Sequence, residues 1–163
     1  MDDFEGKRIE GFYELDIRAS KENIFPLLCP IEEYKWIPGW NCSLVYSKSG
    51  RNERNCVFTE KLSSSSMFDS KVGPATWHTT LFDKEKFEFH AVIFNGATTI
   101  KWEVKLKDGT NGVTKLRWRH ITTALNETAI RLIEEGLEEK LIAMASALLQ
   151  TLRDYCETGE LIK

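Results

Sequence analysis

Residues 126–155 read NETAIRLIEEGLEEKLIAMASALLQTLRDY, and this segment decides how the rest of the chain is interpreted. Its apolar residues recur at steps of three and four, which places them on one face of an α-helix. They are Ala129, Leu132, Ile133, Leu137, Leu141, Met144, Ala145, Leu148, Leu149 and Leu152. Asn126 is suited to cap the start, and some thirty residues predict one helix of about 45 Å. Because a single helix cannot bury its own apolar face, the rest of the chain must supply a surface for it.

Upstream of this helix, segments with alternating apolar side chains predict consecutive β-strands separated by short turns. These segments are residues 9–19, 42–46, 56–60, 76–82, 86–94, 100–106 and 115–120. After the first strand, two short helices are expected, and Pro26 bends or shortens the earlier one. Their ranges are 21–28 and 31–36. The sequence therefore predicts an α+β fold in which a seven-stranded antiparallel sheet receives the long C-terminal helix.

Length and composition indicate an ordinary globular protein, and we expect residues 1–163 to form a single domain. Apolar residues make up 42% and charged residues 29%, while the net charge of −3 argues against nucleic acid as a partner. The four cysteines form no CxxC pair, and the N-terminal residues lack the pattern of a signal peptide. No window of about 20 apolar residues predicts a membrane span. We therefore expect a cytoplasmic protein.

Several segments carry a resemblance to a known superfamily. They are the first strand followed by ASKENIFPLL (19–28), then EYKWIPGW (33–40), CVFT (56–59) and the final helix. Together they resemble the START-like helix-grip superfamily, also called SRPBCC, which includes polyketide cyclase/dehydrase and lipid-transport proteins. The segment WIPGW (36–40) is similar to that of uncharacterised prokaryotic members. The resemblance implies a curved sheet wrapped around the last helix, with a cavity between them that members use for lipids, sterols, polyketides or plant hormones.

The predicted inner face of the sheet is rich in aromatic rings, which is typical of a hydrophobic ligand cavity. Tyr13, Phe58, Phe87, Phe89, Trp102, Leu116 and Trp118 are all expected to face the helix. A solid aromatic core explains the same pattern, so both interpretations stay open. The ligand-contacting residues expected are Trp36, Trp40, Phe58, Trp77, Phe87, Phe89, Trp102, Trp118, His120, Leu137, Leu141 and Met144. Residues 63–74 form a serine-rich loop that either covers the cavity or is a plain connection.

Three polar side chains share the inward phase of the strands: Tyr13, Glu60 and His120. A carboxylate and an imidazole facing an apolar chamber can orient a ligand or exchange a proton with it. Alternatively, Glu60 lies in water at a strand end and His120 is structural, since a shift of one residue exchanges the faces of a strand. These residues are the catalytic candidates if the protein is a cyclase.

The sequence predicts no metal site and no cofactor. Its three histidines, His78, His90 and His120, lie on different predicted strands and lack the spacing of metal ligands. A row of cations is expected on the outer face of the last two strands, either as a solvated surface or as a docking face for an acidic partner or an anionic membrane surface. It comprises Lys101, Lys105, Lys107, Lys115, Arg117 and Arg119. Exposed edge strands also leave a homodimer open.

The leading functional hypothesis is binding or transport of a small hydrophobic molecule (a lipid, a polyketide or an aromatic metabolite) in the internal cavity. The second is a cyclase/aromatase-type enzyme using His120, Glu60 and Tyr13. The third is a protein-interaction module that works through the basic strand face. The superfamily shares one fold across such roles, so the resemblance does not choose among them.

Overall fold

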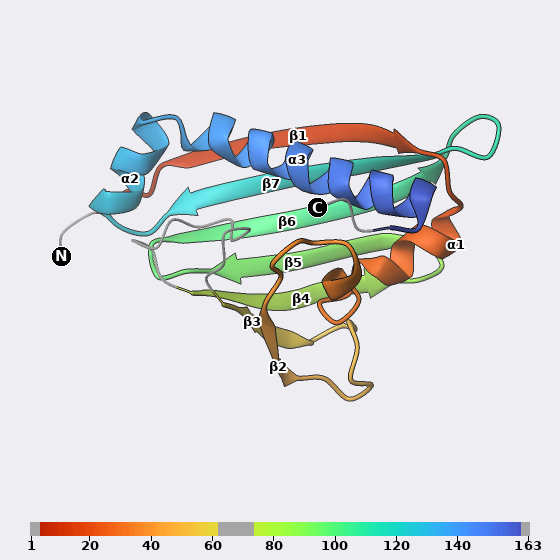
Figure 1. Cartoon of the computed structure of the whole chain (residues 1–163). Helices are drawn as coiled ribbons and strands as arrows, with labels where there is room; N and C mark the ends of the chain where they lie inside the picture. The colour runs from red at the N-terminus through yellow and green to blue at the C-terminus, as the bar shows by residue number, and fades with distance from the viewer. Residues whose placement is uncertain (1–3, 62–73, 161–163) are drawn as a thin grey trace.

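The computed structural model describes residues 4–61 and 74–160, and its main element is one antiparallel sheet of seven strands (Figure 1). The strands are β1 (Arg8–Ile17), β2 (Cys42–Tyr46), β3 (Val57–Glu60), β4 (Ala75–Asp83), β5 (Glu88–Phe94), β6 (Thr98–Asp108) and β7 (Thr114–Ala124). Their order in the sheet is β1-β7-β6-β5-β4-β3-β2. Strands β2 to β7 thus pair with their neighbours in the sequence, as the succession of hairpins predicts, and β1 adds to the far side of β7.

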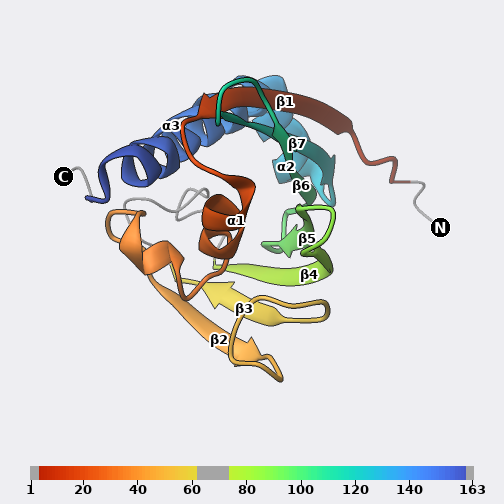
Figure 2. The ribbon, with the colours of Figure 1, turned by 90° about the vertical axis from the view of Figure 1, so that its right-hand side faces the viewer.

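The sheet curves strongly, and helix α3 (Leu137–Thr158) lies along the inside of the curve (Figure 2). Buried side chains from this helix, including Leu141, Ala145, Leu149 and Leu152, pack against the inward residues of the strands. The alternation expected from the sequence is present on β6 and β7, where every second residue from Ile100 to Leu106 and from Leu116 to Ala124 is buried. A helix gripped by a curved sheet is the architecture that the sequence predicts.

Two short helical segments follow β1 and lie at the open side of the sheet (Figure 2). The first consists of α1 (Lys21–Ile24) and the 3₁₀ turn η1 (Phe25–Leu27), and Ser20 caps it by accepting a hydrogen bond from the Asn23 amide at 3.3 Å. Pro26 lies inside η1, so the expected interruption is present. The second segment contains the 3₁₀ turn η2 (Glu33–Lys35).

The C-terminal segment is not one helix, and the prediction of a single 45 Å rod is wrong. It divides into α2 (Glu127–Glu134) and α3, with a break at Gly136. Asn126 caps α2 as expected, accepting a hydrogen bond from the Ala129 amide at 3.0 Å. Gly136 adopts a left-handed conformation with φ of 89°, which glycine accepts without a steric penalty. The periodic pattern did not show this break because the apolar steps of three and four continue across it.

Phe87 is also placed differently from the expectation, because β5 begins two residues later than the expected start at residue 86, at Glu88. Phe87 has a positive φ of 51° in the turn before β5. Its ring lies edge-on to Phe25, with centroids 5.7 Å apart, and the ammonium of Lys21 lies 4.9 Å from its centroid. It thus packs against the first short helical segment. Among the described residues, no helix is long and apolar enough to cross a membrane.

Candidate functional site

A continuous row of rings crosses the inner face of the sheet. Neighbouring ring centroids are 6.5, 5.4, 5.5, 4.8 and 5.2 Å apart along this aromatic row. Its members, in order, are Trp40, Phe58, Trp77, Trp102, Trp118 and His120. The row passes from β4 to β6 across β5, where the small residue Ala91 pairs with Trp102 and leaves room for the indoles. Most of these rings are buried, so the row forms both core and potential ligand surface.

One end of the aromatic row borders a largely enclosed cavity between the sheet, the short helical segments and α3. Its volume is about 50 Å³. Rings line most of it, from Trp36, Trp40, Phe58, Trp77, Phe89 and Trp102. Leu148 and Leu149 of α3 contribute aliphatic surface. Ligand sites usually have volumes of roughly 300–1,000 Å³, so this cavity has room for a chemical group rather than a whole metabolite. The two sequence-based interpretations, cavity and packed aromatic core, therefore both describe part of the interior.

Within residues 4–61 and 74–160, three polar side chains face this cavity: Glu33, Asn52 and Glu60. Glu60 is only 1% exposed, so the alternative that placed it in water is wrong. The Trp77 indole Nε1 donates a hydrogen bond to Glu60 Oε2 at 3.2 Å, which fixes the carboxyl group against the cavity wall. Glu33 reaches the same cavity from η2. Burial, together with the charge of Glu60, raises the pKa of Glu33 to about 8.

The wall formed by the short helical segments is held by indole hydrogen bonds to the backbone. Trp36 Nε1 donates to the carbonyl of Leu27 at 3.0 Å, and Trp40 Nε1 donates to the carbonyl of Pro30 at 2.8 Å. Trp36 is 2% exposed, whereas Trp40 is partly exposed at the margin of the cavity. These bonds tie consecutive turns of one segment together, and none of them joins the segment to the sheet.

Asn52 supplies one such connection, beside the bonds of the Tyr34 hydroxyl to the backbone of Cys42 on β2, although its sequence position in a polar turn gives no sign of it. Its side-chain Nδ2 donates to the carbonyl of Leu28 at 2.8 Å, and its backbone amide donates to Cys29 Sγ at 3.2 Å. Its Oδ1 accepts a hydrogen bond from the hydroxyl of Thr79, on β4, at 2.7 Å. Asn52 is buried, so each of these groups depends on it for a partner.

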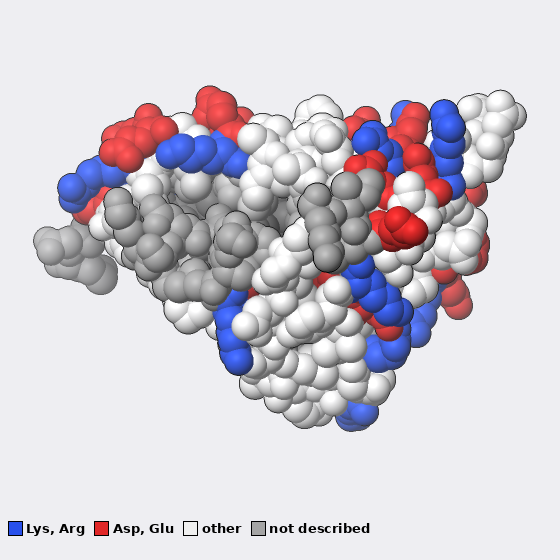
Figure 3. Space-filling view, in the orientation of Figure 1, with Lys and Arg blue, Asp and Glu red and all other residues white. Residues whose placement is uncertain are grey.

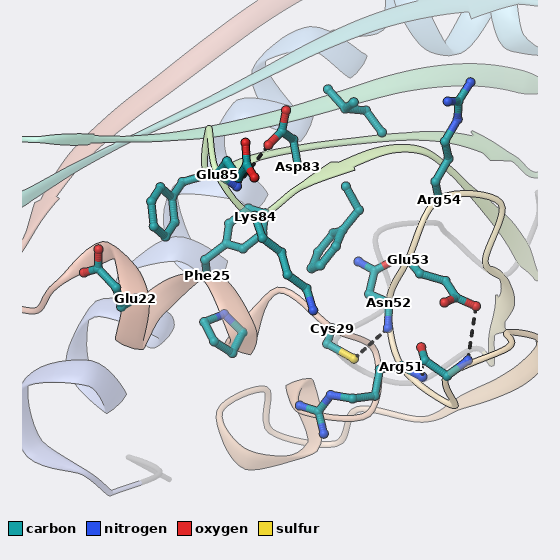
Figure 4. Close-up of a pocket in the computed structure, with 15 residues that line it drawn as sticks. Glu22, Phe25, Cys29, Arg51, Asn52, Glu53, Arg54, Asp83, Lys84 and Glu85 are labelled. Carbon is teal, nitrogen blue, oxygen red and sulfur yellow. Dashed lines mark hydrogen bonds between the residues drawn. The ribbon is translucent and has the colours of Figure 1, made fainter.

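An open groove of about 860 Å³ lies on the other side of Asn52 (Figure 4). It runs between the first short helical segment, residues 49–54 and the β4–β5 turn, and Figure 4 shows the bond from Asn52 to Cys29 beside it. Apolar rings and charges of both signs line the groove, among them Phe25, Phe87, Arg54 and Glu85. Phe87 therefore belongs to this groove and not to the internal cavity. The mixture of charges points to no single class of ligand.

The structure does not bring the three catalytic candidates together. Glu60 lines the cavity, whereas Tyr13 and His120 do not. The Tyr13 hydroxyl accepts a hydrogen bond from Gln150 at 3.4 Å, at the edge where β1 meets α3. His120 is fully buried, with Nδ1 bonded to the Thr122 hydroxyl at 2.9 Å, and Nε2 has no hydrogen-bond partner in the part of the chain that the structure describes. A Cβ atom on Gly11 would lie 2.9 Å from Nε2, so the ring points between β1 and α3.

The buried imidazole predicts a loss of stability in mild acid. Burial lowers the pKa of His120 from the ordinary 6.5 to about 4, so the folded protein holds it neutral. Between about pH 6.5 and pH 4 the unfolded chain binds a proton there that the folded chain does not bind, and the folded state loses on the order of 3 kcal/mol as pH falls. Denaturant unfolding at several pH values should show this slope, which His120→Gln should reduce. His78→Gln, at an exposed position, should leave it unchanged. Parallel curves for wild type and His120→Gln would contradict this account.

Comparison with solved structures gives several matches over nearly the whole chain. Norcoclaurine synthase from Thalictrum flavum matches with a TM-score of 0.66 and 12% identity, covering 93% of this chain and 98% of that chain. The Zhui aromatase/cyclase from Streptomyces matches with a TM-score of 0.67 and 10% identity, covering 96% and 100%. Ginseng major latex-like protein 151 from Panax ginseng matches with a TM-score of 0.65 and 13% identity, covering 95% and 99%. The chain has the START-like helix-grip fold. No protein-family model and no curated protein sequence match it.

Half of the twelve expected ligand contacts lie where the START-like fold encloses the cavity. Six of them, all rings, line the internal cavity. Trp118, His120, Leu137, Leu141 and Met144 lie outside the cavity lining, and pack instead into or against the same core. The lining residues that the sequence analysis did not predict include Glu33, Asn52 and Leu148, of which Glu33 belongs to the short 3₁₀ turn η2 and Asn52 to an irregular segment. Residues 63–73 of the segment considered as a cover lie outside the described residues.

The cations predicted on the outer face of β6 and β7 are largely paired with carboxylates. Lys101 lies 2.6 Å from Glu103, Lys105 lies 2.8 Å from Glu88, and Arg119 lies 2.6 Å from Glu10. Arg117 also lies 3.7 Å from Glu14. Neighbouring strands β1 and β5 supply most of these carboxylates, so the face is close to neutral. The solvated-surface interpretation therefore fits better than docking of an acidic partner or an anionic membrane.

Two further expectations concern metals and a homodimer. Among the described residues, no group of three His, Cys, Asp or Glu side chains is placed to hold a metal ion. β2 is an edge strand with Val45 and Tyr46 exposed, and the surface over β2 and the neighbouring helical segments is mostly uncharged (Figure 3). Such an edge is open to pairing, and the homodimer stays a prediction.

Proposed function

We propose that this protein binds a small hydrophobic molecule in the cavity between the sheet, the short helical segments and α3. The observation that carries the proposal is the cavity lining, in which, among the described residues, six rings surround an interior space and only three polar side chains face it. A mostly apolar lining with a few placed polar groups is the usual composition of a small-molecule site. A protein with the same fold, norcoclaurine synthase, has been solved with dopamine and hydroxybenzaldehyde, which are aromatic molecules.

The small volume implies that the rings separate when a whole lipid, polyketide or aromatic metabolite binds. The wall best suited to move is the one formed by residues 21–40, because individual side-chain hydrogen bonds attach it, such as those of Asn52 and Tyr34, whereas β-ladders hold the opposite wall. Segments without such ladders open at lower free-energy cost than strands of a core sheet. Binding is then coupled to displacement of the short helical segments.

Non-catalytic binding is favoured over cyclase chemistry, because only one of the three candidate acid–base residues faces the cavity. General acid–base catalysis needs its groups within hydrogen-bond reach of one substrate. His120 and Tyr13 lie elsewhere, bonded to Thr122 and Gln150. We place the protein in the cytoplasm, since Cys29, Cys42, Cys56 and Cys156 are all free thiols and such thiols are typical of a reducing compartment.

A pair of adjacent substitutions on α3 tests the proposal. Leu148 lines the cavity, whereas Ala147 is exposed on the same helix. Leu148→Trp should fill the cavity and lower ligand affinity at least about tenfold, because a core site does not accept both the new ring and a ligand. Ala147→Trp should leave affinity unchanged. The ligand is sought first as an extra mass in native mass spectra of the purified protein, and then by tryptophan fluorescence with a panel of lipids and aromatic metabolites.

Equal ligand affinities of the two variants would show that the ligand binds outside this cavity. The absence of any bound mass, together with unchanged fluorescence across the panel, would overturn the binding function itself. Thermal unfolding of both variants is the control for folding.

A further inference from the structure

Asn52 lies between two spaces of the molecule, the internal cavity and the open groove. Among the described residues, it alone lines both. The two residues to which it is bonded on the short helical segments belong to one space each, because Leu28 lines the cavity and Cys29 lines the groove. Figure 4 shows the bond from Asn52 to Cys29 in the lining of the groove. A single side chain therefore separates the cavity from the groove at this point.

The hydrogen bonds of the Asn52 side chain reach both walls of the cavity. Its Oδ1 accepts from the Thr79 hydroxyl on β4 at 2.7 Å, and its Nδ2 donates to the Leu28 carbonyl at 2.8 Å. When residues 21–40 move away from the sheet, the bond to Leu28 breaks while the bond to Thr79 stays. A single side-chain bond costs less to break than a β-ladder, so a gap opens more easily here than between strands.

Aromatic rings lead from the groove to the cavity beside Asn52. In the groove, the ring of Phe25 stacks on that of Phe82, with centroids 4.7 Å apart. Phe82 in turn lies edge-on to Phe89, which lines the cavity, with centroids 6.2 Å apart. A hydrophobic molecule in the groove thus meets apolar surface on its way inward. The groove, at about 860 Å³, also has room for a whole small molecule.

On the basis of the proposed function, we propose that the groove is the entrance to the cavity and that the Asn52 side chain is the gate between them. A ligand passes when the short helical segments move and the bond to Leu28 opens. The bond forms again behind it and closes the cavity. Asn52 thereby controls how fast molecules exchange between the cavity and solvent.

Acrylamide quenching of tryptophan fluorescence tests this route without a known ligand. Four of the five tryptophans are buried, and three of these, Trp36, Trp77 and Trp102, line the cavity. Acrylamide is a small neutral molecule that quenches an indole on contact, so its quenching constant measures entry into the cavity. Iodide is the control for Trp40, which is partly exposed, because a charged ion does not enter an apolar space.

Two substitutions at the same position distinguish an open gate from a loosened wall. Asn52→Ala and Asn52→Leu both remove the bonds to Leu28 and Thr79, so both weaken the attachment of the wall. Leucine has the branched shape of asparagine and keeps the boundary filled, whereas alanine leaves a hole between the two spaces. Asn52→Ala should therefore raise the acrylamide quenching constant at least about threefold above that of Asn52→Leu. Iodide quenching should be the same in both, and Asn41→Ala, at an exposed position, should match the wild type with either quencher.

Equal acrylamide quenching of Asn52→Ala and Asn52→Leu would overturn the gate, whether both values are high or low. Circular dichroism checks that the variants are folded. Should either fail to fold, Asn52→Ser is compared with the wild type instead, because serine shortens the side chain and keeps a hydroxyl for hydrogen bonding. An unchanged quenching constant in Asn52→Ser would equally overturn the gate.

The outcome is independent of the proposed function, because no ligand takes part in the measurement. If the entrance is refuted, the native mass spectrum and the Leu148→Trp comparison still decide whether the cavity binds a hydrophobic molecule.

Discussion

Truncation of Trp118 to alanine should lower the free energy of unfolding by about 3–5 kcal/mol, the range measured for large aromatic side chains in cores. Trp118 is fully buried in the middle of the sheet, with its ring 4.8 Å from Trp102 and 5.2 Å from His120, centroid to centroid. Its removal leaves a void that the flanking rings cannot fill, because each is held by its own strand. Denaturant unfolding monitored by circular dichroism measures the loss.

Phe12 provides the control for this truncation. It lies on β1, but its ring is 57% exposed and contacts mainly the guanidinium of Arg117 at 5.1 Å. Phe12→Ala should therefore cost less than about 1 kcal/mol. A similarly small cost for Trp118→Ala would show that the aromatic row is loosely packed, and would favour a larger internal space than the structure contains.

Replacement of Asn52 by alanine should lower the free energy of unfolding by about 2–4 kcal/mol, because two buried groups then lose their partners. These groups are the Thr79 hydroxyl and the Leu28 carbonyl. The substitution should also free the wall formed by residues 21–40, and amide hydrogen exchange should accelerate in this segment more than in β6 or β7. Asn41→Ala, which alters an exposed side chain of the same type, should have little effect on either quantity.

A double-mutant cycle of Asn52→Ala and Thr79→Val measures the energy of the hydrogen bond between these two side chains. If the 2.7 Å hydrogen bond joins the two elements as described, the combined variant should lose less stability than the two single losses together, with a coupling of about 0.5–3 kcal/mol. Strict additivity would mean that Asn52 acts through packing alone, and the hydrogen bonds of the Tyr34 hydroxyl to Cys42 on β2 would then be the attachment of the short helical segments to the sheet.

The sequence by itself determined the seven strands and their order. Alternation and turn signals act between near neighbours in the chain, so local physics decides them, whereas the helix-grip arrangement was implied by the family resemblance. Other local signals were the helix cap at Asn126, the helix interruption at Pro26 and the inward orientation of Trp102 and Trp118. All of them are present in the structure.

Only the tertiary structure decided what these elements enclose. Whether Gly136 continues a helix or ends one depends on how α3 fits the sheet, because glycine adopts either conformation at similar cost. The direction of His120 was fixed by the space that Gly11 leaves on the neighbouring strand. Periodicity indicates which face a side chain occupies, but not what lies opposite it.

The candidate site depended on tertiary contacts most of all. Glu33 comes from the 3₁₀ turn η2 and Asn52 from an irregular segment, and they line the same cavity as Glu60 only because the short helical segments fold back over the sheet. The cavity volume and the neutral outer face of β6 and β7 depend on distances between side chains far apart in the sequence. Such distances are set by packing of the whole chain, so a pattern of residue types does not contain them.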